Sequence, residues 1–139
     1  MFPFFINEIP LHCINEAAIE YHIPAKMIIS ILNTEQGKNG KINFNKNGTY
    51  DIGLFQINSI WLSELKKYGI SQKYIQYNPC INVKIATWIL AKSITHGHDF
   101  LNGIGNYHSH HPKLNSIYSE KVENNYLKIN SFLNNGENN

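Results

Sequence analysis

The 139-residue sequence contains no arginine, few charged residues (16%) and little net charge of either sign (+2). All 12 basic residues are therefore lysine. A nucleic-acid-binding surface typically shows basic runs interleaved with aromatic residues, and this sequence has no such run. We therefore do not expect nucleic acid as a partner.

Long hydrophobic runs are also missing. No stretch approaches the roughly 20 apolar residues that a membrane-spanning helix needs, so we expect no membrane span. The opening MFPFF, followed by Asn7 and Glu8, has neither the basic start nor the length of a signal peptide. We expect a protein that is soluble as written, with no signal peptide in this numbering.

Cysteine is scarce, with Cys13 and Cys80 as the only two. They lie too far apart in sequence for a CxxC redox or zinc motif. Their spacing alone leaves two alternatives open, a pair of free buried thiols or one disulfide.

The chain is rich in helical patterns instead. Its length and its 42% hydrophobic residues predict a single domain over residues 1–139, with a core at about 10–133 and a disordered C-terminal tail. Apolar residues recur at three- and four-residue spacing between capping residues, which predicts a mainly α fold. The expected helices cover about residues 10–21, 24–35, 59–68, 79–96, 99–106 and 115–132. Pro10, Pro24 and Asn78-Pro79 are the start signals of three of them.

Residues 38–57 break this pattern. They are rich in Asn and Gly at first and lack helical periodicity, and Asn47-Gly48 is a hairpin-turn signal. We expect a small irregular or β-hairpin region here, with DIGLFQIN at 51–58 lining a cleft.

One carboxylate stands out at the end of the second helix. Ile28, Ile31, Leu32 and Glu35 follow helical spacing, so Glu35 points toward the core, and Gly37 suits the left-handed position beyond the helix. Burial and the negative end of the helix dipole both disfavour the charged carboxylate. Glu35 is therefore expected to stay protonated near neutral pH, as a general acid must.

Three segments, in this order and spacing, carry a resemblance to a known family. They are EQG at 35–37, GTYDIGLFQIN at 48–58 with Trp61-Leu62 after it, and GNYHS at 105–109. With these motifs the chain resembles the soluble lytic transglycosylase (SLT) family, specifically its small conjugation- and secretion-associated members with a goose-lysozyme-like fold. The similarity covers roughly residues 10–126.

The resemblance implies a lysozyme-like α+β fold and an enzyme that needs no cofactor or metal. Its substrate would be peptidoglycan, cut at the β-1,4 bond between N-acetylmuramic acid and N-acetylglucosamine to leave a 1,6-anhydro end. Glu35 would be the single acid and base, because the N-acetyl group of the substrate assists departure and the sugar 6-hydroxyl then attacks. Type III or IV secretion or conjugation components would be partners, and the location would be the periplasm.

The resemblance also implies roles for other residues. Gln56 would bind substrate or line the floor beside Glu35, and Tyr107 would donate a hydrogen bond that positions the carboxyl. Gly53 would let the backbone approach the saccharide, and the alternative is that it is a bulge or turn glycine. The further substrate-binding residues implied are Leu54, Phe55, Asn58 and His108. Cys13 and Cys80 would form a disulfide. The chain departs from the usual family residues at Gln36 and His108, where serine and asparagine are common.

Two other functions compete with this interpretation. A lysozyme-type hydrolase would use Glu35 with water, which Asp51 could activate as a second carboxylate does in inverting glycosidases. The alternative, which we prefer, is that Asp51 caps or braces the loop. A non-catalytic wall-binding or assembly module would need no acid at all. Trp61 and Trp88 are interpreted as core residues. Histidines at 96, 98, 108, 110 and 111 fit no metal-binding spacing, and we interpret them as loop residues.

Overall fold

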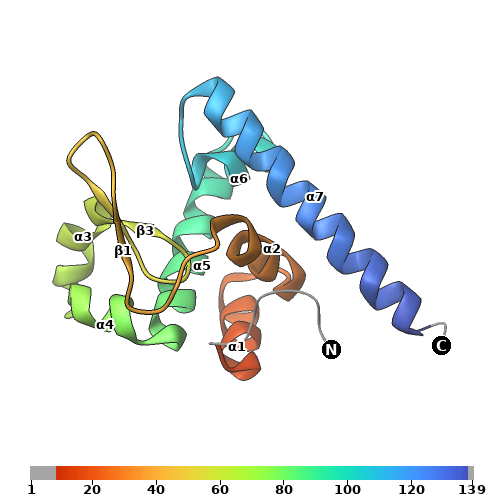
Figure 1. Cartoon of the computed structure of the whole chain (residues 1–139), viewed down its shortest axis with the longest axis horizontal. Coiled ribbons are helices and arrows are strands. Elements are labelled where there is room, and N and C mark those ends of the chain that lie inside the picture. Colours follow the sequence, from red (N-terminus) through yellow and green to blue (C-terminus); the bar gives the residue numbers. More distant parts are fainter. Residues whose placement is uncertain (1–8, 138–139) are drawn as a thin grey trace.

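The structure is a computed structural model that describes residues 9–137, with side-chain exposure described for residues 9–135. Figure 1 shows the arrangement of the elements. In chain order these are α1 (Leu11–Tyr21), α2 (Ala25–Glu35), β1 (Ile42–Phe44), β2 (Tyr50–Ile52), β3 (Ile57–Asn58), the short 3-10 helix η1 (Ser59–Trp61), α3 (Leu62–Lys67), α4 (Gln72–Tyr77), α5 (Pro79–Thr95), α6 (Phe100–Asn106) and α7 (Pro112–Glu137). The expected mainly α fold is confirmed.

Helix α5 is the centre of the molecule. The Asn78 side chain accepts hydrogen bonds from the backbone N–H groups of Cys80 and Ile81, and Pro79 opens the first turn, as the sequence predicts. In Figure 1, α5 lies between the lobe of β-strands, α3 and α4 and the opposite side formed by α1, α2 and α7. Helices α1, α4 and α6 pack directly against α5. This long apolar helix therefore joins the two halves of the fold.

The β region forms a three-stranded antiparallel sheet of order β1-β2-β3. Asp51, in the middle strand, stands opposite Asn43 on one side and Asn58 on the other. The turn between β1 and β2 contains Gly48 with φ of 87°, a conformation that favours glycine. The hairpin expected at 38–57 is therefore present, and its third strand continues to Asn58.

Helix α2 ends differently from the expectation. The left-handed residue after the helix is Gln36, with φ of 53°, and not Gly37. Gly37 is buried, and a Cβ there would collide with the carbonyl oxygens of Gly53 and Leu54. Glycine is needed at 37 for space, because the chain after the helix passes directly over the 53–54 backbone.

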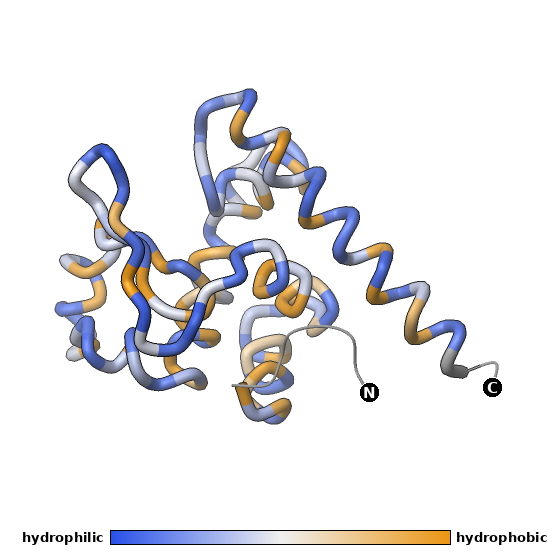
Figure 2. Tube along the Cα trace, viewed as in Figure 1, coloured by the Kyte–Doolittle hydropathy of each residue, from blue (hydrophilic) through white to orange (hydrophobic). Residues whose placement is uncertain are grey.

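The C-terminal helix α7 is longer than expected, since it begins at Pro112 and reaches Glu137. It packs on α2 and α6. Figure 2 shows apolar and polar residues alternating along it, as in an amphipathic helix. Residues 134–137 of the tail expected to be disordered are therefore helical, and 138–139 lie outside the described residues. Helix α4 was not predicted.

A disulfide joins Cys13 of α1 to Cys80 at the start of α5, with the two Cα atoms 5.3 Å apart. The pairing implied by the family resemblance is therefore present. Among residues 9–137, none of the helices has both the length and the hydropathy needed to cross a bilayer. The signal-peptide prediction falls on residues 1–8, outside the described residues.

Candidate active site

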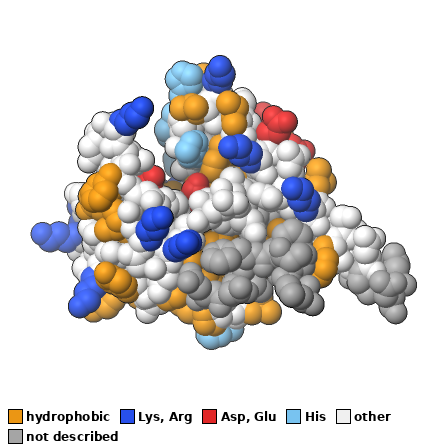
Figure 3. Space-filling model, viewed as in Figure 1, with side chains coloured by type: hydrophobic (Ala, Val, Ile, Leu, Met, Phe, Trp, Pro, Cys, Tyr) orange, Lys and Arg blue, Asp and Glu red, His pale blue; other side chains and the backbone are white. Residues whose placement is uncertain are grey.

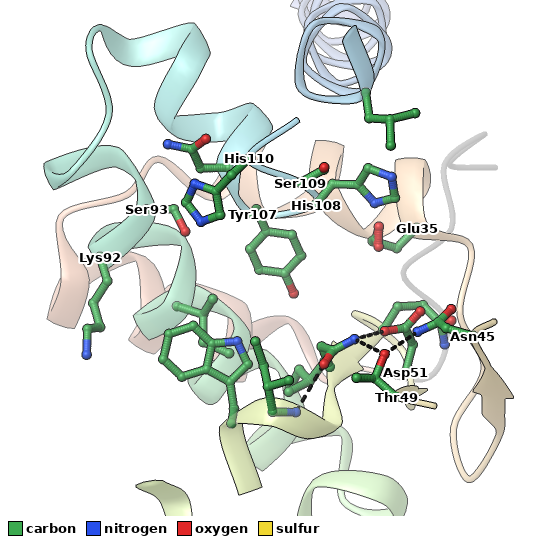
Figure 4. A pocket seen from close by; sticks show the side chains of 18 of the residues that line it. Glu35, Asn45, Thr49, Asp51, Lys92, Ser93, Tyr107, His108, Ser109 and His110 are labelled. Atoms are coloured by element: carbon green, nitrogen blue, oxygen red, sulfur yellow. Dashed lines mark hydrogen bonds between the residues drawn. The ribbon is translucent and has the colours of Figure 1, made fainter. Parts of the chain in front are cut away.

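A cleft of about 670 Å³ separates the hairpin lobe from the loop between α6 and α7. Its walls come from the end of α2, the hairpin, α5 and that loop. Figure 3 shows acidic side chains within this hollow, with histidines along one rim. Figure 4 shows the lining side chains converging from these separate elements. The cleft is therefore assembled by the tertiary fold from four distant stretches of sequence.

Glu35 lines this cleft at the last residue of α2. Desolvation by burial, and then the negative charge of Asp51, raise the pKa of the Glu35 carboxyl to about 8. Burial acts because a low-dielectric environment disfavours the charged form. The carboxyl therefore carries its proton at neutral pH and faces a space that can admit a ligand.

Asp51 lines the same cleft from β2. The Asn58 side-chain amide donates to Asp51 Oδ1 at 3.0 Å and to Thr49 Oγ1 at 3.1 Å. These bonds follow from strand register, because Asp51 and Asn58 are cross-strand partners. A second carboxylate is therefore fixed in the cleft near Glu35. Asn58, which also lines the cleft, holds this carboxylate in place.

Gln56 lies in the left-handed region, with φ of 53°, and lines the cleft. Its side-chain amide donates to the Gly53 carbonyl at 2.9 Å, and its Oε1 accepts from Asn43 Nδ2 at 2.8 Å. The side chain thus ties the turn after β2 to strand β1. Gln56 is at the predicted place in the cleft, and its polar atoms are already bonded to the protein.

Tyr107 also lines the cleft, but its predicted hydrogen bond is wrong. Its hydroxyl donates to the Phe55 carbonyl at 2.8 Å and not to Glu35. A phenol has one proton to donate, so this bond uses it. Burial, followed by the charge of Glu35, raises the pKa of Tyr107 well above its ordinary value. Tyr107 therefore anchors the α6–α7 loop to the segment after β2.

Tyr118 of α7 is a site residue that the sequence analysis missed. Only 4% of its surface is exposed, and its hydroxyl is buried without a hydrogen-bond partner in the described structure. It nevertheless lies near enough to the Glu35 carboxyl to lower its pKa, and Glu35 contributes to raising that of Tyr118. Its helical spacing with Asn115 and Val122 marked it only as part of a buried face, so no local signal distinguished it.

The predicted substrate contacts at 53–55 need correction. Leu54 and Phe55 are 1% and 2% exposed and belong to the core, so their side chains do not reach the cleft. Gly53 has φ of 71°, and a Cβ there would press against Asn82 Nδ2. The conformation of the turn and the buried neighbour are therefore sufficient to require glycine at 53.

Asn82 is the buried polar residue that fixes this turn. Its amide donates to the carbonyls of Ile75 and Ile52 at 2.8 and 3.2 Å, and its Oδ1 accepts from the Phe55 N–H at 3.0 Å. It is 1% exposed. A single amide in an otherwise apolar helix was visible in the sequence, but its three partners were not.

His108 lines the cleft, as predicted, and its ring stacks on Tyr118 with centroids 4.9 Å apart. Burial lowers its pKa. Trp61 is half-buried and lines the cleft as well as packing on the core, which the interpretation as a core residue missed.

Among the described residues, His12, Cys13 and Cys80 form the one group of at least three His, Cys or acidic side chains close enough to share a metal ion. The two sulfurs are joined to each other, so they offer no thiolate. None of the histidines at 96–111 falls in such a group.

Comparison with known proteins agrees with this geometry. The family model described as the transglycosylase SLT domain matches residues 12–128. The chain belongs to the transglycosylase SLT family. This SLT domain is 33% identical over 130 residues to Invasion protein IagB of Salmonella typhimurium, with 89% of this chain and 81% of IagB covered. It is 28% identical to Protein IpgF of Shigella flexneri, covering 84% and 80% of the two chains. It is 31% identical to the Peptidoglycan-binding-like protein of Escherichia coli O157:H7, covering 88% and 80%.

Membership of the SLT family supports a lytic-transglycosylase-like role on peptidoglycan, which implies an extracytoplasmic location. It also agrees with the mainly α, lysozyme-like fold described above.

Proposed function

We propose that this SLT domain is a lytic transglycosylase that cleaves the β-1,4 bond between N-acetylmuramic acid and N-acetylglucosamine, leaving a 1,6-anhydro end. The observation that carries the proposal is the Glu35 carboxyl, which has a pKa of about 8 and lines a cleft large enough for sugars. A protonated acid at neutral pH is what departure of a glycosidic oxygen requires.

The reaction needs no second protein nucleophile. Glu35 gives its proton to the leaving glycosidic oxygen as the bond from C1 breaks, and the carbonyl oxygen of the N-acetyl group bonds to C1 in its place. The 6-hydroxyl of the same sugar then attacks C1, the bond to the N-acetyl oxygen breaks, and the hydroxyl proton returns to Glu35. The acid is regenerated, and water is not consumed.

The supporting residues position this acid. Asp51 raises the pKa of Glu35, and the Tyr118 hydroxyl faces the carboxyl. Tyr107 and Gln56 hold the neighbouring backbone through Phe55 and Gly53. Asn58 and His108 complete the polar lining toward the substrate.

A second candidate, a lysozyme-type hydrolase, is favoured by one observation. Asp51 shares the cleft with Glu35, and its oxygen is held by Asn58. A fixed second carboxylate is what a glycosidase uses to activate water or to stabilise a charged intermediate.

Mass spectrometry of digested peptidoglycan distinguishes the two reactions. Muropeptides with 1,6-anhydro ends support the transglycosylase, and reducing ends support the hydrolase. Glu35→Gln should lower the cleavage rate by about 100-fold to 10,000-fold in either case, because an amide cannot supply the proton. Full cleavage by Glu35→Gln would refute a catalytic role for Glu35, whereas binding of peptidoglycan without cleavage by the wild-type protein would favour a wall-binding module. Thr34→Ser, one residue away on α2, is the matched control and should remain active.

We further propose that the domain works in the periplasm and opens the wall locally for a type III or IV secretion or conjugation apparatus. Support comes from the disulfide, which forms in oxidising compartments, and from similarity to a protein named for invasion. Deletion of the gene should lower assembly of the apparatus, and Glu35→Gln should fail to restore it. Restoration by Glu35→Gln would overturn this role.

A further inference from the structure

One end of the cleft carries a positive charge that the proposed chemistry does not use. Lys92 lies on α5 and lines the cleft together with Trp61, Ser93 and His96. We call these four residues the Lys92 subsite. Among the cleft-lining residues that the structure describes, Lys92 is the single lysine, while Glu35 and Asp51 are the acids.

The two kinds of charge are separated in space. In Figure 4, Lys92 and Ser93 lie on one side of Tyr107, and Glu35 and Asp51 lie on the other. An anionic group of a bound ligand is attracted to the first side and repelled by the Asp51 carboxylate on the second. The cleft therefore carries side chains of opposite charge on its two sides.

The Lys92 ammonium is held in place but can still donate hydrogen bonds to a ligand. It lies 4.5 Å from the centroid of the Trp88 ring and 5.5 Å from that of Trp61, which orients its side chain. Its contact with Glu64 Oε1 is 3.4 Å, longer than the roughly 2.7–2.9 Å of a strong charge-assisted hydrogen bond. Both side chains of this pair are more than a third exposed, at 39% and 36%. An ammonium has three donors, so a ligand oxygen can bind without displacing Glu64.

His96 adds a second polar group to the subsite. Its Nδ1–H donates to the Lys92 carbonyl at 2.8 Å, which fixes the ring and leaves Nε2 without a bond to the backbone. Trp61 supplies an apolar face beside the ammonium. The combination of a lysine, an oriented imidazole and an indole face fits a carboxylate attached to an apolar stem.

We propose that the Lys92 subsite binds a carboxylate carried by the muramic acid of the glycan strand, and so fixes the direction of the strand in the cleft. This inference rests on the proposed function. Two sources offer that chemistry, a carboxylate of the stem peptide and the lactyl carboxylate of muramic acid itself. Either one would place the muramic acid side chain over α5.

Steady-state kinetics on three soluble substrates test the proposal. They are uncrosslinked strands with intact stem peptides, strands stripped by an amidase to expose the lactyl carboxylates, and stripped strands whose lactyl carboxylates are converted to amides. Lys92→Gln should raise KM about fivefold to tenfold for the carboxylate-bearing strands, relative to KM for the amidated strands. A rise limited to intact strands identifies a stem-peptide carboxylate, because the lactyl carboxyl of these strands is bound in the amide to the peptide. A rise limited to stripped strands identifies the free lactyl carboxylate.

Lys84→Gln is the matched control, because it makes the same charge change on α5 outside the cleft, where Lys84 pairs with Glu20. Equal KM values for Lys92→Gln and Lys84→Gln on every substrate would overturn the inference while leaving the proposed function intact. If wild-type protein cleaves none of the strands, the proposed function fails instead.

Two further variants keep the test decisive if Lys92→Gln does not fold. Lys92→Arg retains the charge and should keep KM within about twofold of wild type. Glu64→Gln releases the ammonium from its ion pair and should lower KM for carboxylate-bearing strands. An unchanged or raised KM for Glu64→Gln would count against the subsite.

Discussion

At the scale of single residues, the proposed chemistry depends on where one carboxyl is placed. Glu35 ends α2, so its side chain faces the cleft and the negative end of the helix dipole at once. Burial and Asp51 both raise its pKa, and the Tyr118 hydroxyl lowers it. The balance leaves a proton on the acid at neutral pH.

The pH dependence of cleavage should follow this proton. Because the pKa of Glu35 is about 8, activity should fall as pH rises through 8, by about tenfold for each further unit. Rates of glycan cleavage between pH 5 and 10 provide the measurement. Asp51→Asn, which removes the second cause of the raised pKa, should move the alkaline limb to lower pH. A limb centred near pH 4.5 would contradict the assignment.

The same proton should affect stability. The folded pKa is raised from 4.5 to about 8, so the folded state keeps a proton that the unfolded chain releases. The contribution to stability is therefore fully present below pH 4.5 and is lost as pH rises through 8. Glu35→Gln should remove this loss, so its free energy of unfolding should fall less than that of wild type between pH 5 and pH 8, by about 3–4 kcal/mol. Urea denaturation of both proteins at the two pH values measures it, and parallel changes would contradict it.

At the scale of elements, the turn from β2 to β3 is fixed by contacts from α2, α5 and α6–α7. Gly37 lets the chain after α2 lie on the 53–54 backbone, and Tyr107 bonds to the carbonyl of Phe55. Asn82 bonds to three backbone groups around the same turn. The floor of the cleft is therefore held from both lobes.

Asn82→Ala should test this arrangement. It leaves one buried N–H and two buried carbonyls without this partner, and should cost about 2–4 kcal/mol of unfolding free energy and reduce cleavage. Thr87→Val is the control on the same helix, since the Thr87 hydroxyl bonds only to the Val83 carbonyl one turn back. Its cost should be under about 1 kcal/mol. Similar losses from both variants would contradict a special role for Asn82.

At the scale of the whole molecule, the cleft exists because separate helices are held at fixed positions around α5. The core runs from Ile9 to Ile129 and includes residues of α1, α2, α5, α6 and α7. The disulfide ties α1 to the start of α5, far from the cleft-lining residues of α5 at its other end. The disulfide therefore stabilises the packing of α1 on α5, which we call the frame, and takes no direct part in the proposed chemistry.

Removing the disulfide should destabilise the frame without altering the chemistry. Replacing both Cys13 and Cys80 by serine should lower the free energy of unfolding by about 4 kcal/mol, given the sequence separation of 67 residues. Denaturation of wild type with and without reductant should show the same difference, and the double variant should not respond to reductant. The alkaline limb of activity should stay near pH 8 in the variant as long as it is folded. A shifted limb would indicate that the disulfide acts on the site.

Most of the helices, the hairpin and the inward-facing Glu35 carboxyl could be predicted from local sequence patterns. Helix starts at Pro10, Pro24 and Asn78-Pro79 were readable because capping and proline geometry act within a few residues. The spacing of Glu35 on its helix likewise placed the carboxyl on the inward face. The hairpin at 38–57 followed from its turn residues.

The tertiary fold determines which side chains line the cleft and which ones hold its walls. Tyr118, Asn82 and Lys92 each have a partner 27 or more residues away in the chain, and local spacing does not reveal such contacts. The Tyr107 hydroxyl has one proton, and it donates that proton to the Phe55 carbonyl. Gly37 is glycine because the 53–54 backbone leaves no room for a Cβ, and Gln36 adopts the left-handed conformation after α2. Periodicity and caps are local properties of a chain, whereas burial, charge proximity and shared hydrogen bonds exist only once distant segments meet.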